Sequence, residues 1–325
     1  MRVTAIIPSR SQEHGPLVRC LLSLLEIGDA NLRIIASMDG PYAPSDLRPL
    51  TRGGAVEVLT GPQGGPGAAR NRALDRAEGD LVLFLNDDVV ADAGLIDAHR
   101  AAHADGAPRL VLGAAPFAVP QDDRVIDRLT RETSLLFFYS EMDDHEPERD
   151  WGFRHAWTLN LSLPREICDP FDARMRYAMF DDLEWAYRVT RRTGAPVVFR
   201  PGAGVVHHHR YEPQGLLARE ALLGHQALAL RRINPACAAA IFGERFDGSR
   251  ASMRDARALS TPQAAEAYEE FESLAQRPAL SVNVHDLFAR ARAWRWSARG
   301  IGYRSAMRGH EPPRHPLALG EGVGA

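Results

Sequence analysis

The stretch Gly79-Asp80-Leu81-Val82-Leu83-Phe84-Leu85-Asn86-Asp87-Asp88 decides the fold of this chain. Its five consecutive apolar residues predict a strand buried on both faces, as in parallel sheets covered by helices. Asp87 and Asp88 stand at the carboxyl end of that strand, where such sheets bind their ligands. Because Mg²⁺ is commonly held by one or two carboxylates plus substrate phosphates, the pair predicts a site for a divalent metal, Mg²⁺ or Mn²⁺, that holds a diphosphate.

The neighbouring segments alternate between strands and helices. Apolar runs predict strands at 3–7, 32–37, 56–59 and 109–113, and helical spacing predicts helices at 17–25, 68–77 and 95–104. This alternation predicts an α/β fold with a doubly wound, mostly parallel sheet. Polar residues follow two more of these strands, at Ser9-Arg10 and at Asp39. Three strand ends therefore converge on one candidate site.

The second half of the chain changes character twice. Residues 120–150 are irregular and charged, which predicts a mobile insertion or lid over the site. Residues 157–163 alternate apolar and polar side chains, as a half-exposed strand does. Long helical segments follow residue 213. We predict a catalytic domain at 1–212, a helical C-terminal region at 213–308 and a disordered tail at 309–325.

Composition excludes several function classes. The net charge of −3 over 325 residues indicates no general affinity for nucleic acid. All 39 basic residues are arginine, which excludes a Schiff-base lysine and a P-loop lysine. The three cysteines are scattered among apolar residues, so we expect buried thiols rather than a disulfide or a nucleophile.

No leader sequence and no apolar run of membrane-spanning length is apparent, so we expect a cytoplasmic location. The basic aromatic segment around Trp294 and Trp296 predicts a helix packed on the domain, and weak docking to the inner face of the membrane is the alternative.

The Gly-rich turn at 61–67 resembles a phosphate loop only loosely. It lacks the Gly-x-Gly-x-x-Gly spacing, and its prolines remove backbone donors, which disfavours a dinucleotide site. Arg70, one turn into the following helix, has two equal interpretations: a bidentate ligand of a diphosphate, or a residue on a solvated helix face.

Two later clusters carry titratable groups. Cap and dipole chemistry explains one acid at a helix start, but Asp181, Asp182 and Glu184 exceed that need. Their mutual repulsion favours a raised pKa and a general base. His207-His208-His209 follows a strand, so at least one imidazole faces the site and is a candidate metal ligand. The chain shows no zinc-hydrolase helix motif and no Gly-x-Ser-x-Gly elbow.

The order of these motifs is specific. An opening strand ends in Ile-Pro-Ser, and Asp-Gly, Gly-x-x-Arg-Asn, Ala-x-Gly-Asp with Phe-Leu-Asn-Asp-Asp, Pro-Phe-Asp, Asp-Asp-Leu-Glu and Val-Val-His follow. Over residues 3–210 the chain resembles a family 2 glycosyltransferase of the GT-A fold. The resemblance implies an inverting, single-displacement transfer of sugar from a nucleoside-diphosphate sugar to an acceptor hydroxyl.

The resemblance also implies roles for individual residues. Asp182 matches the general base, and Asp88, with Asp87 and His207, matches the metal ligands. The nucleotide side comprises Pro8, Ser9, Arg10, Asp39, Gly67, Arg70, Asn86 and Asp87. The acceptor side comprises Trp157, Asn160, Asp181 and Glu184.

Three departures qualify the match. Arg10 stands where the family often has an aromatic residue, and Asn86 replaces the first aspartate of Asp-x-Asp. A Gln-x-x-Arg-Trp segment is missing, which argues against a processive polysaccharide synthase. The alternatives are a sugar-nucleotide pyrophosphorylase, a non-catalytic nucleotide-sugar binder and, less favoured, a dehydrogenase. The sequence does not identify the sugar, the base, the acceptor or the oligomeric state.

Overall fold

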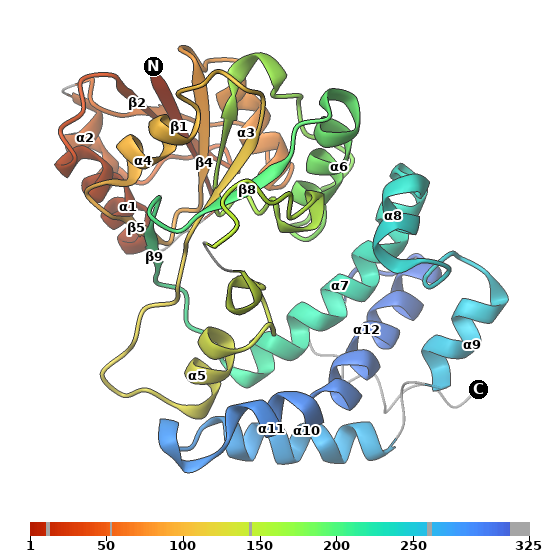
Figure 1. Ribbon diagram of the computed structural model, residues 1–325. Coiled ribbons are helices and arrows are strands. Elements are labelled where there is room, and N and C mark those ends of the chain that lie inside the picture. The colour runs from red at the N-terminus through yellow and green to blue at the C-terminus, as the bar shows by residue number, and fades with distance from the viewer. Residues whose placement is uncertain (11–13, 53, 143–144, 259–261, 313–325) are drawn as a thin grey trace. The chain divides into compact units, whose positions relative to one another are not determined.

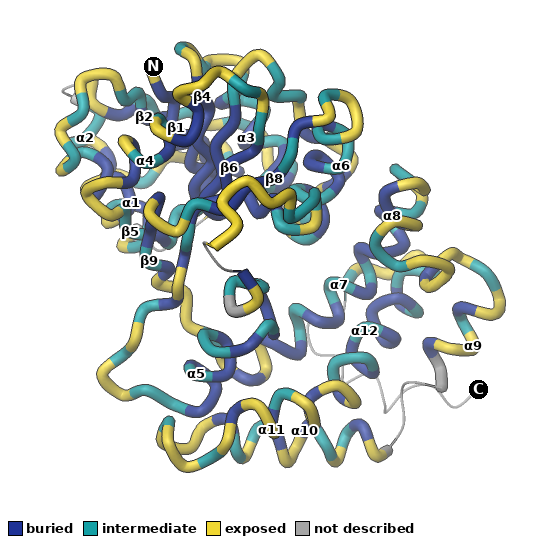
Figure 2. Tube along the Cα trace, viewed as in Figure 1, coloured by how far each residue is buried: buried dark blue, intermediate teal, exposed yellow. Residues whose placement is uncertain are grey.

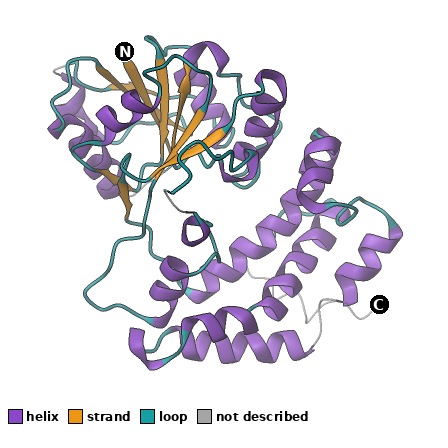
Figure 3. Ribbon diagram, viewed as in Figure 1, coloured by secondary structure: helices purple, strands orange, loops and turns teal. Residues whose placement is uncertain are grey.

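The computed structural model describes residues 1–10, 14–52, 54–142, 145–258 and 262–312. The greater part of the predicted tail, 313–325, lies outside the described residues. Packing divides the chain into two compact units (Figure 1). Unit 1 comprises Met1–Ala118 and Glu141–His209, and unit 2 comprises Val119–Ser140 and the chain from Arg210 onward. In the part of the chain that the structure describes, every strand belongs to unit 1 (Figure 3).

Unit 1 is built on a seven-stranded sheet. Its strands follow the order β3 (Glu57–Leu59), β2 (Leu32–Met38), β1 (Val3–Ser9), β4 (Leu81–Leu85), β7 (Asn160–Pro164), β6 (Leu110–Gly113) and β8 (Val197–Arg200). β7 runs antiparallel to both of its neighbours, and the other pairs are parallel. A separate antiparallel pair joins β5 (Val89–Ala91) and β9 (Val205–His207). The predicted α/β fold with a mostly parallel sheet is confirmed.

Helices cover this sheet because the strands are apolar on both faces. The helices of unit 1 are α1 (His14–Glu26), α2 (Arg48–Arg52), α3 (Pro66–Leu74), α4 (Leu95–Ala102) and α6 (Asp181–Thr193). α3 packs on β1 and β2, and α4 packs on β6 and β8. All five residues of β4 are buried, and the sheet forms the buried centre of the unit (Figure 2).

The alternation at 157–163 does not produce the predicted half-exposed strand. Asn160 and Ser162, the polar members of β7, are both completely buried. β7 lies between β4 and β6 in the interior of the sheet, so neither of its faces meets water. Its polar side chains form hydrogen bonds instead with two buried histidines, His99 of α4 and His103, which follows that helix.

Unit 2 is helical. It contains α5 (Val125–Glu132), α7 (Pro213–Ile233), α8 (Pro235–Phe242), α9 (Arg250–Ala258), α10 (Pro262–Ala275), α11 (Val284–Arg290) and α12 (Arg292–Met307). α7 and α12 approach closely: a Cβ on Gly224 would lie 1.9 Å from the Arg299 carbonyl oxygen. Side-chain-free positions are required for such a contact between helix backbones.

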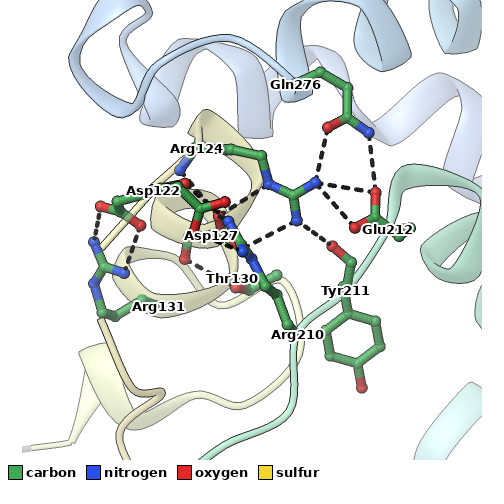
Figure 4. A network of polar contacts seen from close by, with 10 residues as sticks. Asp122, Arg124, Asp127, Thr130, Arg131, Arg210, Tyr211, Glu212 and Gln276 are labelled. Atoms are coloured by element: carbon green, nitrogen blue, oxygen red, sulfur yellow. Dashed lines mark hydrogen bonds and ion pairs between the residues drawn. The ribbon is translucent and has the colours of Figure 1, made fainter. Parts of the chain in front are cut away.

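Residues 119–140, predicted as part of the catalytic domain, pack in unit 2 and include helix α5. Arg210 explains the packing, since its Nη1 donates to Asp122 at 2.8 Å and its Nη2 to Asp127 at 2.9 Å (Figure 4). Arg124 binds Glu212 at 3.0 Å in the same network. These ion pairs attach the segment to the chain that enters α7, so the boundary of the compact unit lies at 209/210.

The basic aromatic segment lies on α12. Trp294 is buried against Tyr268 and Phe271 of α10, which leaves it unable to dock to a membrane surface. Trp296 lies between the guanidinium groups of Arg245 and Arg299. Within the described ranges, no helix combines the length and the apolar character that a bilayer crossing requires.

Candidate active site

The ends of β1 and β4 place the first cluster of polar groups. Ile6 pairs with Phe84, so Ser9 is level with Asp87, three residues further along each parallel strand. The Ser9 hydroxyl donates a short hydrogen bond to Asp87 Oδ2. Neighbouring β2 ends level with Ser9, and Asp39 follows it directly, with its backbone N–H bonded to the Ser9 carbonyl at 2.7 Å. The predicted convergence of these three strand ends is present.

Two histidines face Asp88. His207 Nε2 lies 3.2 Å from Asp88 Oδ1, and His209 Nδ1 lies 3.3 Å from Oδ2. The intervening His208 binds Asp88 through its backbone N–H, and its side chain is exposed. Phe117 stacks on the His207 ring with centroids 4.7 Å apart. Since alternate residues of β9 share a face, the first and third histidines are the two directed at the carboxylate.

The two adjacent carboxylates have opposite electrostatics. Burial raises the pKa of Asp87, and the Ser9 hydrogen bond opposes this only in part. Burial would also raise the pKa of Asp88, but His207 and His209 outweigh it and hold that pKa well below its usual range. Asp88 is therefore the more acidic member of the pair.

The donor set fits a hard divalent cation. Asp88 Oδ1 is buried and lies 3.2 Å from His207 Nε2, so this oxygen and the imidazole nitrogen are close enough to bind one cation together. Carboxylate oxygens and a neutral imidazole are suitable ligands for Mg²⁺ or Mn²⁺. Among the described residues, no group of three or more His, Cys, Asp or Glu forms a complete site.

The Gly-rich turn is held by Asp39. Its Oδ1 accepts from the backbone N–H groups of Gly64 and Gly65, at 2.7 and 3.0 Å. At Gly65, φ is +90°, and a Cβ there would lie 2.3 Å from the Arg176 carbonyl oxygen. A Cβ added at Gly67 would lie 3.1 Å from Phe171 Cβ. These glycines let the turn pack against the segment that leads to α6.

Four further residues predicted to bind the nucleotide, Pro8, Ser9, Arg10 and Asn86, lie at or just after the ends of β1 and β4. Pro8 and Ser9 are buried at the end of β1, whereas Arg10 is exposed. The Gln63 amide oxygen, in the orientation that satisfies its hydrogen bonds, accepts from Nε and Nη2 of Arg10 at 2.8 Å. Asn86 begins the turn after β4, and its backbone N–H binds the Leu159 carbonyl at 3.2 Å. Arg10 is thus attached to the Gly-rich turn through Gln63.

Arg70 is not on a solvated helix face. It is 4% exposed, its Nη1 donates to Asp181 Oδ2 at 3.0 Å, and its guanidinium lies over the Phe171 ring at 5.3 Å. The surface interpretation of Arg70 is wrong. The structure instead joins two residues predicted for opposite sides of the site, since Asp181 stands at the start of α6.

Asp182 lies beside this ion pair in the first turn of α6. The turn is entered through Met179 and Phe180, both with positive φ (91° and 65°), a conformation that costs free energy for residues other than glycine. Desolvation and the charge of Asp181 raise the pKa of Asp182 to about 7, against the opposing influence of Arg70. A partly exposed carboxylate with such a pKa suits proton abstraction at neutral pH.

All four residues predicted for the acceptor side, Asp181 among them, are buried. Glu184 is 1% exposed and receives two hydrogen bonds from Arg188 Nε, at 2.8 and 3.1 Å. Trp157 is 6% exposed, just before β7. Asn160 is completely buried, and its amide donates to the carbonyl oxygens of Ala114 and Ala203, at 3.1 and 2.8 Å.

The sequence did not predict the chain of buried hydrogen bonds that surrounds Asn160. His103 Nε2 bonds Ser162 Oγ at 2.9 Å, Ser162 Oγ bonds His99 Nδ1 at 2.7 Å, and His99 Nε2 bonds Asn160 Oδ1 at 3.0 Å. Burial lowers the pKa of His99 to about 4, so the imidazole is neutral. Asn160 thereby fixes the segments that precede β9, since Val205 N–H also binds the Ala114 carbonyl. Polar residues at alternate positions of an apolar strand were the available signal.

Aromatic side chains pack together around the segment that precedes Asp181 and Asp182. Phe84 of β4 contacts Phe171 and Trp185 edge-on, and these two rings stack with centroids 5.0 Å apart. The Trp185 indole N–H donates to the Asp169 carbonyl at 2.7 Å. The rigid centre of β4 therefore braces the segment before α6.

The comparison with family models defines the class. Residues 4–158 match the family described as Glycosyl transferase family 2. Residues 4–158 are therefore a glycosyl transferase family 2 domain, which confirms the resemblance predicted from the motifs of the chain. Members of this family typically use a divalent metal. The matched range includes Asp39, Arg70 and Asp88 and ends before Asp182 and His207, whose roles stay predictions.

Curated relatives agree with this assignment. The chain is 27% identical over 246 residues to the pre-mycofactocin glycosyltransferase of Mycobacterium tuberculosis (strain CDC 1551 / Oshkosh), covering 72% of this chain and 48% of that protein. It is 34% identical over 199 residues to the succinoglycan biosynthesis protein ExoW of Rhizobium meliloti (strain 1021), covering 56% and 61%. The chain thus spans less than two thirds of the length of these relatives.

A solved structure shares the fold. Staphylococcus aureus TarS 1–349, determined in complex with UDP-GlcNAc, matches with a TM-score of 0.50 and 15% identity. The match covers 96% of this chain and 93% of TarS 1–349. At this identity the likeness concerns the fold.

Proposed function

We propose that the protein is a metal-dependent, inverting glycosyltransferase that moves a sugar from a nucleoside-diphosphate sugar to an acceptor hydroxyl. The observation that carries the proposal is the pair of acidic clusters in unit 1. One is an ionised aspartate faced by two histidines at a strand end, and the other is an aspartate whose raised pKa suits a base. Two carboxylates whose environments separate their pKa values are a recognised sign of divided chemical roles.

In this proposal Asp88 is the principal metal ligand, and Asp87 and His207 complete the protein side of the site. The buried position of Asp88 Oδ1, 3.2 Å from His207 Nε2, supports this choice. Bound there, a divalent cation would act as a Lewis acid that neutralises charge on a leaving diphosphate. Ser9 and Asp39, at adjoining strand ends, are proposed to face the nucleoside, and Arg10 its outer edge.

Asp182 is proposed as the general base. Its carboxylate would take the proton of the acceptor hydroxyl as that oxygen forms a bond to the anomeric carbon and the diphosphate leaves from the opposite face. A positioned base of this kind typically contributes about 10²–10⁴-fold to the rate. Its pKa of about 7 matches the requirement that a base bind protons reversibly near neutral pH.

A UDP-sugar is the proposed donor. The fold relative TarS 1–349 was determined with UDP-GlcNAc, and this suggests which nucleotide to test first. The predicted cytoplasmic location is consistent with access to nucleotide sugars and stays a proposal. The acceptor is proposed only as a hydroxyl compound.

The first experiment measures thermal stabilisation by a panel of nucleoside diphosphates and nucleotide sugars, each with and without Mg²⁺ or Mn²⁺. A ligand of the native state raises the melting temperature by mass action. The best donor is then incubated with hydroxyl acceptors, and the released nucleotide is identified. Release of a nucleoside diphosphate supports glycosyl transfer. Release of pyrophosphate indicates a pyrophosphorylase, and binding without turnover by any acceptor or water indicates a non-catalytic binder.

A further inference from the structure

The contact between α3 and the start of α6 has a second attachment point. Asn71, next to Arg70, donates from Nδ2 to the Phe171 carbonyl at 2.8 Å and accepts from the Phe171 N–H at 2.7 Å. Arg70 itself pairs with Asp181 at 3.0 Å. Two adjacent residues of α3 thus hold the connection to α6 at its beginning and at its end.

Both members of the Arg70–Asp181 pair are buried, with side chains 5% and 6% exposed. Arg70 Nε is buried and makes no hydrogen bond within the described ranges. A buried ion pair holds a fixed geometry, because separating the two groups leaves an uncompensated charge out of water. Because Arg70 reaches Asp181 through Nη1, the pair fixes the guanidinium beside the start of α6.

Several other charged side chains on the adjoining elements have partners of their own. On α6, Glu184 pairs with Arg188 at 2.8 Å. In the preceding loop, Asp172 pairs with Arg174. On α3, the Arg72 guanidinium donates to the Met38 carbonyl at 2.8 Å. Arg70 and Asp181 are therefore the charges that bear most directly on Asp182.

We propose that Arg70 and Asp181 are positioning residues that hold the first turn of α6, and with it the carboxylate of Asp182, in place for proton abstraction. The proposal rests on the proposed function of Asp182 as the base. It assigns Arg70 to the base rather than to the donor diphosphate. Its physical content is that a buried charge pair fixes a helix start entered through two strained residues, Met179 and Phe180.

The two members of the pair act on Asp182 with opposite sign. Asp181 repels the ionised carboxylate, whereas Arg70 attracts it. Asp181→Asn should therefore lower the pKa of Asp182, and Arg70→Met should raise it. Charges at such short range move a carboxyl pKa by roughly one unit or more. A purely structural role for the pair would not produce opposite displacements.

The test is a ¹³C NMR titration of the aspartate side-chain carboxyl carbons in the full chain, with the Asp182 signal assigned by its loss in Asp182→Asn. The expected result is a lower titration midpoint in Asp181→Asn and a higher one in Arg70→Met. Midpoints within about 0.3 pH unit of the unmodified protein in both variants, or displacement in the same direction, overturn the proposal. Because this measurement needs no turnover, it stands even if the transferase activity is not found.

Folding is controlled separately, since Arg70→Met leaves Asp181 unpaired. The double variant Arg70→Met/Asp181→Asn removes both charges, and we expect it to fold with a midpoint between those of the single variants. Arg192→Met is the matched control, because Arg192 pairs with Asp169 near the other end of α6 and is half exposed. It should leave the Asp182 midpoint unchanged.

Kinetics provide the second readout once a donor is known. Arg70→Met should lower kcat and leave the donor KM within about twofold, with the acidic limb of the kcat profile displaced to higher pH. A donor KM raised tenfold or more with an undisplaced pH profile would make Arg70 a donor ligand and overturn the proposal.

Discussion

The two acidic pairs of unit 1, Asp87-Asp88 and Asp181-Asp182, differ in what surrounds them. Asp88 faces two imidazoles, which hold its pKa low. Asp182 faces a second carboxylate, and its pKa is raised. The residue types are the same, so neighbours alone separate a carboxylate that stays charged from one that exchanges a proton near neutrality. The comparison teaches that adjacent aspartates in a sequence have no common role until their partners are known.

The largest expected effect removes the proton-exchanging member. Asp182→Asn keeps the shape of the side chain and eliminates the base, so transfer should fall by about 10²–10⁴-fold. Binding of the nucleoside diphosphate, measured by calorimetry with metal, should persist. Asp97→Asn, at an exposed position on α4, is the control and should retain full activity. Weakened nucleotide binding with intact turnover would assign Asp182 to the donor side.

Removing the charged member should cost somewhat less. Asp88→Ala takes away the proposed metal ligand, and we expect a loss on the order of 100-fold together with loss of the response to added Mg²⁺ or Mn²⁺. The measurement is a metal titration of turnover. His208→Ala is the matched control, because its side chain is exposed and the imidazoles that contact Asp88 are those of His207 and His209. Undiminished activity of Asp88→Ala in chelator would contradict the assignment.

The acidic side of the pH profile should report Asp182. Because the base must be ionised and its pKa is about 7, kcat should fall about tenfold per pH unit below neutrality. Asp182→Asn should abolish this limb in any residual activity. A limb that begins near pH 4, the ordinary value for an aspartate, would mean that the surroundings of Asp182 do not raise its pKa.

The free energy of unfolding should also depend on the protonation of Asp182. The direction of this pH dependence is opposite to that of an aspartate in a salt bridge, whose pKa is lowered by folding. The folded pKa of Asp182 is raised above its unfolded value, so the folded state binds this proton more tightly. Its contribution to stability is fully present below pH 4 and is lost as pH rises through 7. Urea unfolding across this range should therefore show a decline that Asp182→Asn lacks. An identical pH dependence in the two proteins would rule out the linkage.

The smallest expected effect concerns the Gly-rich turn at 61–67, which packs against the segment that leads to α6. Gly65→Ala places a Cβ against the Arg176 carbonyl and forces φ of +90° on alanine, so unit 1 should lose about 1–3 kcal/mol of unfolding free energy. Gly202→Ala, with open space around its Cβ position, should change little. Differential calorimetry measures both variants. Equal melting temperatures would show that the turn adjusts without cost.

The sequence allowed the strands, the order of the elements and the acidic residues after β4 to be predicted, because these features depend on local sequence patterns. The apolar run Leu81–Leu85 predicted β4, and the residues after β1, β2 and β4 predicted a convergence that the structure contains. The alternation of apolar and polar residues at 157–163 gave a wrong prediction of a half-exposed strand, because both faces of β7 are buried. The segment 120–150 was predicted to be irregular, but residues 125–132 form α5, and Arg210, far along the chain, binds Asp127 of this helix.

From the amino-acid order alone come the α/β class, the family and the identity of the two acidic clusters, since these follow from periodicity and from residues close in sequence. Only the tertiary structure pairs Arg70 with Asp181, 111 positions away, selects His207 and His209 over His208, and buries Asn160 within a hydrogen-bond chain. The physical reason is that charge and desolvation act through space. A carboxylate's pKa depends on which distant groups the fold brings within a few ångströms of it.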